Sequence, residues 1–339
     1  MPDRMAEIRS FLDQTDWKDA TSAPLAGDAS NRKYLRLTRP SGDTAVLMDA
    51  APESGEDTRP FIRIARYLCA QNLSAPQIYA HDEARGLLLL EDLGDALFAR
   101  VVAADPALEI PLYNAATDML LDLHTCEPPK LPAYDAGIMA DMAALAFDWY
   151  ATGAGRAAPE ARQDFHTAMH AALSQYAPET DVIILRDFHA ENLLWLPKRQ
   201  GVARVGLLDF QDAMLGHRAY DLLSMLQDAR RDVPPSVEAE MIRRYVAASG
   251  VDMQQFTAAY HCLAAQRNLR ILGVFARLCL KDGKPGYIDL IPRVWGLLQR
   301  DLAHPALANI SRILTASLPS PTPETLQILK DKCATHPAQ

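Results

Sequence analysis

An aspartate, an asparagine and a second aspartate follow short apolar runs at spacings that suit phosphoryl transfer. Asp187 and Asn192 come after the run Val182 to Leu185, and Asp209 comes after a second run that ends at Leu208. Phosphoryl transfer needs a base that orients the attacking hydroxyl and oxygen ligands for magnesium, because the protein mainly positions reactants and neutralises charge. The sequence therefore predicts Asp187 as the catalytic base and Asn192 and Asp209 as magnesium ligands.

The segment between Asn192 and Asp209 predicts how these two side chains are positioned. Two apolar runs flank a turn at residues 197–201, and two short strands pairing there bring Asn192 and Asp209 side by side. Asp187 and Asn192 also have the D-x-x-x-x-N spacing of the kinase catalytic loop, and Asp209 begins an Asp-Phe pair like that of the metal-binding signal. A capping aspartate and a turn asparagine are the simpler explanation for isolated residues. The ordered combination favours a kinase-like enzyme.

Composition limits the classes of function. The chain has 339 residues, 49% of them hydrophobic and 23% charged, which is typical of a globular protein large enough for two lobes. The net charge of −9 argues against nucleic-acid binding, which usually needs a basic stripe. No apolar run approaches the ~20 residues of a membrane span. Five scattered cysteines without a C-x-x-C pair fit a reduced cytoplasm. We expect a cytoplasmic monomer with neither nucleic acid nor membrane as partner.

The order of expected elements predicts an α+β, protein-kinase-like fold with two lobes. A small, sheet-rich N-terminal lobe spans residues 1–93 and ends in a hinge, and a larger helical C-terminal lobe spans residues 94–339. Strands are expected in the first lobe because short apolar runs alternate with turn residues, and helices in the second because apolar residues recur at helical spacing. The main expected segments are strands at 44–49, 78–81 and 86–91, and helices at 57–71, 108–124, 138–150, 160–176 and 256–280.

Two local features bear on the helical lobe. Ser236 is a plausible helix N-cap, with Glu238 and Glu240 in the first turn where they favour the helix dipole. Gly273 predicts an interruption of the long helix at 256–280.

From about residue 22 to about residue 300, the chain resembles the aminoglycoside phosphotransferase family of small-molecule kinases. Within that family it is most similar to the kinases that phosphorylate the anomeric hydroxyl of N-acetylmuramate and N-acetylglucosamine in cell-wall recycling. The motifs that carry this similarity are Gly27-Asp28-Ala29-Ser30 with Arg32-Lys33-Tyr34, Leu47-Met48-Asp49-Ala50, Leu90-Glu91-Asp92-Leu93-Gly94-Asp95, Arg186-Asp187-Phe188-His189 and Gln266-Arg267-Asn268-Leu269-Arg270.

The resemblance implies ATP and Mg²⁺ as cofactors and assigns further roles. It makes Asp187 the base, and Asp221 an aspartate that braces the catalytic loop through backbone N–H bonds, with Arg186 as the arginine common in kinase loops. It also places the hinge at Glu91 to Leu93, where backbone groups bind the adenine. The turn that contains Gly27 and Ser30 precedes Arg32 and Lys33, and its N–H groups could cradle phosphate.

Two departures from the kinase pattern stand out. Leu185 occupies the position where the family's histidine usually precedes the loop. Met48 occupies the strand position of the lysine that pairs with the α- and β-phosphates. Arg32 or Lys33 could supply the missing cation, and the other interpretation is a solvated strand edge.

Candidate substrate-binding residues lie in and beyond the catalytic loop. His189 could contact substrate or phosphate, or pack within the loop, and Asp212 could face substrate hydroxyls or cap a turn. Arg267 and Arg270 fall in one sector of an otherwise apolar helix, so they need partners if buried. They could bind the lactyl carboxylate of N-acetylmuramate, or form internal ion pairs with acids such as Asp221.

The sequence thus predicts an ATP- and magnesium-dependent kinase that phosphorylates a hydroxyl of a small molecule, with the anomeric hydroxyl of N-acetylmuramate or N-acetylglucosamine implied by the resemblance. A kinase for an aminoglycoside or a choline-like amine is the first alternative, and it predicts a strongly acidic pocket. A catalytically inactive, nucleotide-binding pseudokinase is the second, and it is motivated by Met48.

Overall fold

The protein forms two compact units. The structure is a computed structural model that describes residues 4–25 and 32–335. The first unit, here the sheet unit, comprises Met1–Cys126 and Ala190–Ala213, and the second, the helical unit, comprises Glu127–His189 and Met214–Gln339. Residues 94–126 and 190–213 therefore pack with the sheet, so the predicted lobe boundary near residue 93 does not coincide with the boundary between compact units. That lobe boundary stays a prediction.

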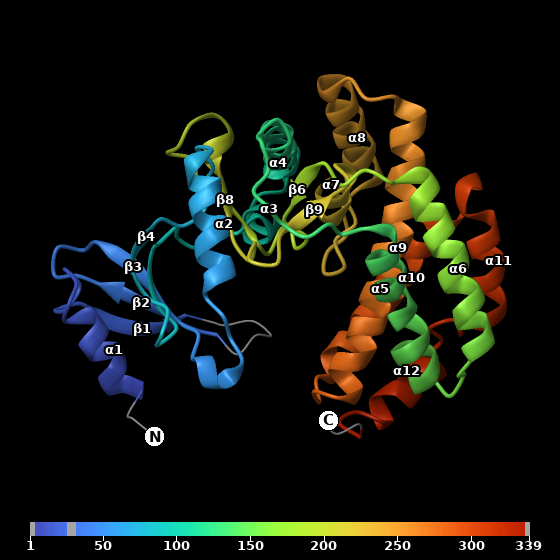
Figure 1. The fold of residues 1–339 in the computed structure, drawn as a ribbon, viewed down its shortest axis with the longest axis horizontal. Helices are drawn as coiled ribbons and strands as arrows, with labels where there is room; N and C mark the ends of the chain where they lie inside the picture. Colours follow the sequence, from blue (N-terminus) through green and yellow to red (C-terminus); the bar gives the residue numbers. More distant parts are fainter. Residues whose placement is uncertain (1–3, 26–31, 336–339) are drawn as a thin grey trace. The chain divides into compact units, whose positions relative to one another are not determined.

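A five-stranded antiparallel sheet organises the sheet unit (Figure 1). Its spatial order is β1-β2-β3-β5-β4, and β5 is buried along most of its length because four consecutive leucines follow Gly86. Gly86 has φ +64°, and a Cβ there would lie 2.0 Å from the carbonyl oxygen of Ala50, so only glycine fits this turn. The strands are β1 (Thr21–Leu25), β2 (Lys33–Thr38), β3 (Thr44–Asp49), β4 (Ile78–Asp82) and β5 (Leu87–Glu91).

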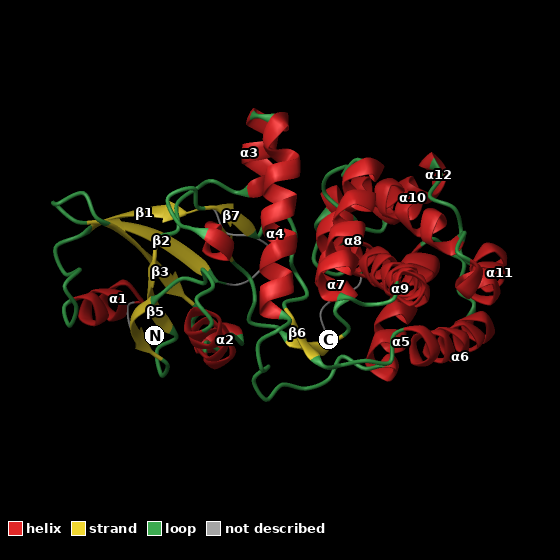
Figure 2. Ribbon diagram, turned by 90° about the horizontal axis from the view of Figure 1, so that it is seen from above, coloured by secondary structure: helices red, strands yellow, loops and turns green. Residues whose placement is uncertain are grey.

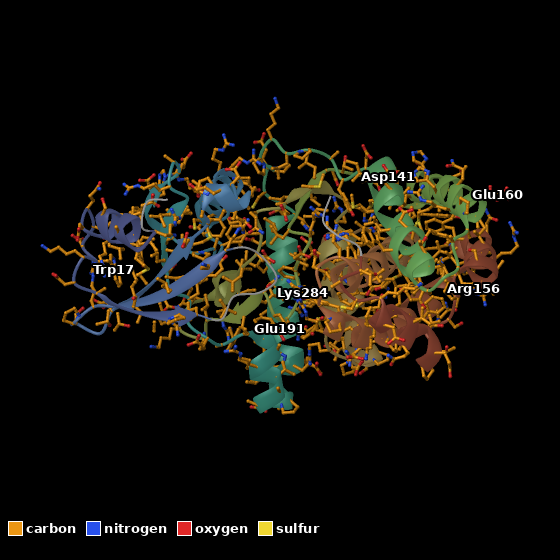
Figure 3. The ribbon with its side chains drawn as sticks, turned by 90° about the horizontal axis from the view of Figure 1, so that it is seen from below. Trp17, Asp141, Arg156, Glu160, Glu191 and Lys284 are labelled. Carbon is orange, nitrogen blue, oxygen red and sulfur yellow. The ribbon has the colours of Figure 1, made fainter. Side chains whose placement is uncertain are left out.

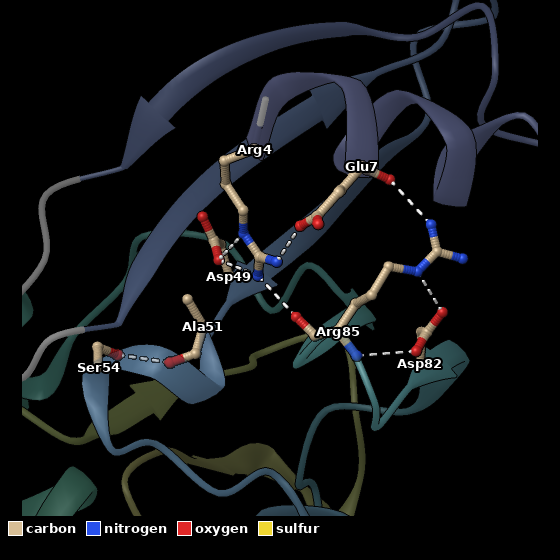
Figure 4. Close-up of polar contacts among 7 residues, drawn as sticks. All are labelled: Arg4, Glu7, Asp49, Ala51, Ser54, Asp82 and Arg85. Carbon is tan, nitrogen blue, oxygen red and sulfur yellow. Dashed lines mark hydrogen bonds and ion pairs between the residues drawn. The ribbon is translucent and has the colours of Figure 1, made fainter. Parts of the chain in front are cut away.

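Helix α1 (Arg4–Leu12) covers one face of this sheet. Ile8 and Phe11 of the helix share a buried cluster with Leu37 and Leu47 of the strands. Trp17, labelled in Figure 3, belongs to the same cluster. Arg4 fastens the helix, because its guanidinium donates to Asp49 at 3.0 and 2.5 Å, to Glu7 at 2.7 Å and to the Arg85 carbonyl at 2.7 Å (Figure 4).

The remainder of the sheet unit is built from three helices and a hairpin. Helix α2 (Arg59–Ala70) buries one apolar stripe that includes Phe61, Ile64 and Leu68, at the spacing of an amphipathic helix. The hairpin joins the unit through bridges Ser74↔Gly206 and Leu97↔Leu194. The other elements are the 3₁₀ turns η1 (Pro52–Ser54), η2 (Pro106–Leu108) and η4 (Gly201–Arg204), helices α3 (Phe98–Ala104) and α4 (Glu109–Leu123), and strands β7 (Leu193–Trp195) and β8 (Val205–Leu207).

The helical unit is organised around the long helix α9 (Met253–Leu280), against which α5, α6, α7, α10 and α12 pack (Figure 2). Most of α9 is buried, which explains why its sequence is apolar on nearly all sides. Strand β6 (Val182–Ile184), which precedes the loop with Asp187, pairs antiparallel with β9 (Met214–Gly216), which follows that loop. The other elements are α5 (Ala136–Leu145), the π-helical turn η3 (Ala146–Ala151), α6 (Pro159–Tyr176), α7 (Ala219–Leu226), α8 (Pro235–Ser249), η5 (Pro285–Leu290), α10 (Ile291–Leu302), η6 (Pro305–Leu307), α11 (Ala308–Ser317) and α12 (Pro323–Asp331).

The structure corrects two expectations for the helices. Helix α9 runs through Gly273 without interruption, and a Cβ at this position would lie 2.4 Å from the backbone of Leu145. The glycine therefore serves close packing of α9 against the end of α5 rather than a break. Helix α8 begins at Pro235 with Pro234 as its N-cap, so Ser236 lies inside the first turn. Proline is well suited to the first helical position because its missing N–H is not needed there.

The described helices include none that is both long enough and apolar enough to cross a membrane. The α+β class is confirmed by the antiparallel sheet and the many helices.

Candidate active site

A tight hairpin positions Asn192 and Asp209 in the sheet unit. Strands β7 and β8 pair antiparallel with Leu193 opposite Leu207, and the Leu208 N–H donates to the Asn192 carbonyl at 3.0 Å. The two side chains meet just beyond the paired strands, where Nδ2 of Asn192 lies 3.5 Å from Oδ2 of Asp209. The predicted strand pairing is thus present, with both side chains at one end of the hairpin.

The donor set at this end of the hairpin fits a hard cation. Asp209 is exposed and Asn192 is half-buried, and together they offer carboxylate and amide oxygens. Mg²⁺ prefers such ligands and usually completes its shell with water and substrate phosphates. Within residues 4–25 and 32–335, no group of three or more His, Cys, Asp or Glu is arranged to hold a metal. A site with two protein ligands is consistent with magnesium that is carried largely by a nucleotide.

Asp209 has a backbone conformation that is unusual for a residue with a side chain. Its φ is +57°, in the left-handed region. Gln211 donates to its Oδ1 at 2.7 Å, and the ring of the following Phe210 stacks on Phe61 of helix α2 at 4.9 Å between centroids. These contacts hold the turn at Asp209, and a strained conformation of this kind is common at functional sites.

In the helical unit, the loop that contains Asp187 is fixed by a buried carboxylate. Asp221 on α7 is fully buried, and it accepts the Leu185 N–H at 2.6 Å and the Arg186 N–H at 2.9 Å. These are the contacts that the resemblance implies for a bracing aspartate. Burial raises the pKa of Asp221 to about 7 against the effect of the two N–H bonds, and the charge of Asp187 raises it further. The site therefore holds an acid whose charge depends on the pH near neutrality.

The Arg186 and Arg270 side chains lie near two tyrosines. Arg186, whose φ is +71°, places its guanidinium 5.2 Å from the centre of the Tyr134 ring, and Tyr134 packs edge-on against Tyr220 at 5.4 Å. Burial acts to lower the pKa of Arg270, but the phenols of Tyr220 and Tyr134 and the Asp187 carboxylate raise it overall. Asp187 and Arg270 therefore lie close enough to interact.

His189 and Arg267 are both buried in the helical unit, with 8% and 4% of their surfaces exposed. Arg267 donates to the Gln227 carbonyl at 3.3 Å, and its charge acts to lower the pKa of Asp221. Burial lowers the pKa of His189, and the neighbouring charges of Arg230 and Arg267 act in the same direction. A neutral His189 can donate and accept hydrogen bonds, which suits contact with a hydroxyl or a phosphate.

The predicted hinge is held by ion pairs within the sheet unit. Glu91 pairs with Arg199 at 2.5 Å, so its side chain is engaged and only its backbone remains suited to adenine recognition. Arg36 of β2 pairs with Asp92 and Asp95, at 2.7 Å in each case. Leu93, between these residues, is half-buried.

The other predicted nucleotide and substrate residues have different surroundings. Gly27 and Ser30 lie outside the described residues. Arg32 forms an ion pair with Glu56 at 2.8 Å, whereas Lys33 and Asp212 are exposed. Sequence reasoning did not single out Glu56, because Glu53 lies only three residues before it in the same turn-rich segment and spacing alone cannot choose between them. It also did not assign a role to Tyr134 and Tyr220, because a buried tyrosine cannot be told from an ordinary core residue by sequence alone.

Comparison with known proteins agrees with this geometry. Residues 21–265 match the phosphotransferase enzyme family. The N-acetylmuramate/N-acetylglucosamine kinase of Caulobacter vibrioides is 42% identical, and the alignment covers 91% of this chain and 95% of that protein. The GDP complex of an aminoglycoside 2′-phosphotransferase mutant has a TM-score of 0.61 at 16% identity, with coverage of 91% and 100%. An ADP-bound aminoglycoside phosphotransferase has a TM-score of 0.58 at 15% identity, with coverage of 88% and 97%.

The structural likenesses, at low identity, confirm the predicted kinase-like fold. The family match spans most of the chain and contains both the loop with Asp187 and the hairpin that carries Asn192 and Asp209. The chain therefore belongs to the phosphotransferase enzyme family.

Proposed function

We propose that this enzyme uses ATP and Mg²⁺ to phosphorylate the anomeric hydroxyl of N-acetylmuramate and N-acetylglucosamine. The observation that carries the chemistry is the hairpin pairing Leu193↔Leu207, because it brings Asn192 and Asp209 together as an oxygen-rich pair. The substrate is supported by the name of the relative that is 42% identical over nearly the whole chain.

In the proposed reaction, the sugar hydroxyl oxygen forms a bond to the γ-phosphorus, and the bond from that phosphorus to the β-γ bridging oxygen breaks. Asp187 orients the hydroxyl and accepts its proton, which later passes to solvent, and ADP leaves with the electron pair of the broken bond. Asn192 and Asp209 would hold Mg²⁺, which when bound neutralises charge on the phosphates.

Asp221 and Arg186 support this step without touching the reactants. Asp221 fixes the two peptide N–H groups that precede Asp187, so the base keeps its direction during turnover. Arg186 packs its guanidinium against Tyr134 and anchors the same loop. A loop that is already held in place accelerates the reaction more than a flexible one, because its groups need not reorganise when the phosphoryl group is transferred.

For the nucleotide, we propose that backbone groups at Glu91 to Leu93 bind the adenine and that the turn with Gly27 and Ser30 lies at the phosphates, with Arg32 or Lys33 as the cation. For the sugar, we propose His189, Asp212, Arg267 and Arg270. Arg270 is the strongest of these, because its guanidinium lies near Asp187 and a guanidinium suits the carboxylate of N-acetylmuramate.

We also propose a monomeric, cytoplasmic protein. All five cysteines are free thiols, with none in a disulfide, which fits a reducing compartment. Light scattering of the purified protein tests the oligomeric state, and a mass twice that of the chain would contradict the monomer.

A substrate panel tests the proposed function. ATP and GTP are each offered with N-acetylmuramate, N-acetylglucosamine, kanamycin and choline, and phosphorylation is followed by ADP or GDP release and by mass spectrometry of the product. We expect turnover on both sugars with ATP, and a product whose phosphate is lost in mild acid, as expected of an anomeric phosphate. Turnover on kanamycin or choline alone would replace the sugar with an amine substrate. No turnover with bound nucleotide would indicate a pseudokinase.

A further inference from the structure

Strand β3 lacks the cation that kinases place on it. Met48 is fully buried and lies between Tyr34 of β2 and Leu88 of β5 in the sheet, so an apolar side chain fills the position of the phosphate-binding lysine. In kinases that lysine forms an ion pair with a glutamate of the following helix, and both must be in place for activity. A working enzyme needs another side chain for this role.

The two candidate cations, Arg32 and Lys33, belong to different faces of the sheet. Side chains of a strand alternate between faces, and directly paired residues of adjacent strands share a face. Leu47 packs against α1, and Asp49 binds Arg4 of α1 (Figure 4), so Lys33, which pairs with Asp49, lies on the α1 face. Tyr34 pairs with Met48 and therefore lies on the opposite face, where the missing lysine would be.

Arg32 belongs with Tyr34 rather than with Lys33. It lies two residues before Tyr34, and the charge of Arg32 acts to lower the pKa of Tyr34, so the two side chains are near each other. Nε of Arg32 also donates to Oε2 of Glu56 at 2.8 Å, and the two side chains of this pair are only 12% and 15% exposed. Glu56 lies just before helix α2, which makes this an ion pair between the sheet and the approach to the helix. A pair so shielded from water carries a desolvation cost that a surface pair does not, and it fixes the guanidinium of Arg32 in one place.

The Arg32–Glu56 pair is also linked to the candidate metal ligand. Burial raises the pKa of Tyr34, and the nearby carboxylates of Asp209 and Glu56 act in the same direction, so Tyr34 lies within reach of both charges. From the helix side, Phe61 of α2 stacks on Phe210, the residue after Asp209. The Arg32–Glu56 ion pair and Asp209 thus lie in the same part of the sheet unit, with Tyr34 near both.

We propose that Arg32, positioned by Glu56 and Tyr34, is the phosphate-binding cation that replaces the strand lysine at Met48. The assignment rests on the proposed use of a nucleoside triphosphate. A guanidinium presents several N–H donors in a fixed fork, so Arg32 can keep its bond to Glu56 while it donates to phosphate oxygens. A lysine at position 48 would approach the phosphates from β3 and not from the start of β2. Its single ammonium group would also lack the fork of donors that a guanidinium offers.

Nucleotide affinity tests the proposal without relying on turnover. The dissociation constants of ADP with Mg²⁺ and of adenosine are measured by calorimetry for the wild type and for Arg32→Ala. We expect ADP to bind about tenfold more weakly to Arg32→Ala, whereas adenosine, which has no phosphate, changes less than about twofold. Arg32→Lys should recover part of the ADP affinity, because it restores the charge without the fork.

Three further variants make the outcome specific. Lys33→Ala removes the neighbouring charge from the other face and should change ADP affinity less than Arg32→Ala does. Lys18→Ala removes one charge from an exposed position of the same unit and serves as the control for net charge. Glu56→Gln tests the positioning role, and we expect it to raise KM for ATP by a larger factor than it lowers kcat.

The results separate this proposal from the proposed function. If the wild type binds neither ADP nor GDP, the proposed function fails. If it binds ADP and Arg32→Ala binds ADP equally well, only the role of Arg32 fails. Equal weakening of ADP and adenosine binding in Arg32→Ala would show a structural ion pair, and a larger effect of Lys33→Ala would assign the cation to Lys33. Circular dichroism and thermal unfolding confirm that each variant is folded.

Discussion

The two compact units position their candidate functional residues in different ways. In the sheet unit, Asn192 and Asp209 are placed by the register of a hairpin, so backbone hydrogen bonds do the positioning and the side chains stay accessible. In the helical unit, the loop before Asp187 is held by the side chain of Asp221, which is completely buried. The first arrangement depends on main-chain geometry, and the second depends on one carboxylate and its state of charge.

This difference suggests a division of labour. Groups that bind a nucleotide and its metal gain from exposure, because the phosphates bring much of the coordination shell with them. A base that must point at one hydroxyl gains from a rigid loop, because small misplacements are costly in rate. Variants in the two units should therefore fail in different measurements.

The largest expected effect comes from Asp187→Asn. The side chain keeps its size but no longer accepts a proton, so we expect kcat to fall by about 10²- to 10⁴-fold. The dissociation constant of ADP with Mg²⁺ should stay within about twofold of the wild type, since the nucleotide groups are unchanged. Asp181→Asn, at an exposed position of the same unit, is the matched control. Near wild-type turnover in Asp187→Asn would remove the base from the mechanism.

Asp209→Asn should affect both binding and turnover. Loss of a charged oxygen ligand weakens the hold on magnesium, so we expect kcat to fall by about 10²- to 10³-fold and the magnesium dependence of ADP binding to shift to higher concentration. Glu191 (Figure 3) is an exposed residue of the same segment, so Glu191→Gln removes one negative charge and serves as control. An unchanged magnesium dependence in Asp209→Asn would contradict the metal role.

Features of this molecule that depend on neighbouring residues in the sequence could be predicted, and features that depend on distant residues could not. The strand at 44–49 and the hairpin around residues 197–201 were predictable because alternation and turn residues are local. The family and the kinase-like fold followed from ordered motifs. The ion pair Arg32–Glu56 was not predictable, because its two residues are 24 positions apart and only the packed sheet brings them together.

Close packing and helix starts were also hard to predict. A glycine lowers helix propensity, so Gly273 predicts a break. In the structure it is needed because a Cβ there would collide with the backbone of Leu145, which is distant in sequence. The start of α8 is set by Pro234 and Pro235, whose fixed φ angle outweighs the capping preference of Ser236. The composition of the compact units could not be predicted for the same reason, since the helices at 98–123 and the hairpin pack with the sheet through contacts distant in sequence.

The smallest expected effect is on the pH dependence of folding stability, through Asp221, the buried residue that holds the loop before Asp187. The pKa of Asp221 is raised to about 7 in the folded protein, whereas an unfolded aspartate titrates near 3.9. Between these values the folded state binds more protons than the unfolded state, so this group makes stability fall as pH rises from about 4 to about 7. Asp221→Asn lacks the titration, so its stability should vary less with pH in that window.

Thermal unfolding between pH 4 and pH 8 measures this effect. The two backbone N–H groups lose part of their acceptor in Asp221→Asn, so this variant should be less stable than the wild type by about 1–3 kcal/mol. The difference should be largest near pH 4 and should shrink toward pH 7. A difference that grows with pH would mean that Asp221 is ionised throughout the range, and the buried charge would then be fully compensated by its neighbours.

The division of the chain between the units has a consequence for synthesis. Residues 190–213 complete the sheet unit, but residues 127–189, which are made earlier, belong to the helical unit. Part of the helical unit therefore leaves the ribosome before the sheet unit can be completed. The contacts Ser74↔Gly206 and Leu97↔Leu194 join residues 132 and 97 positions apart. Long-range contacts of this kind slow folding and leave apolar surface exposed in the nascent chain. The emerging protein should thus depend on chaperones until residue 213 has left the exit tunnel.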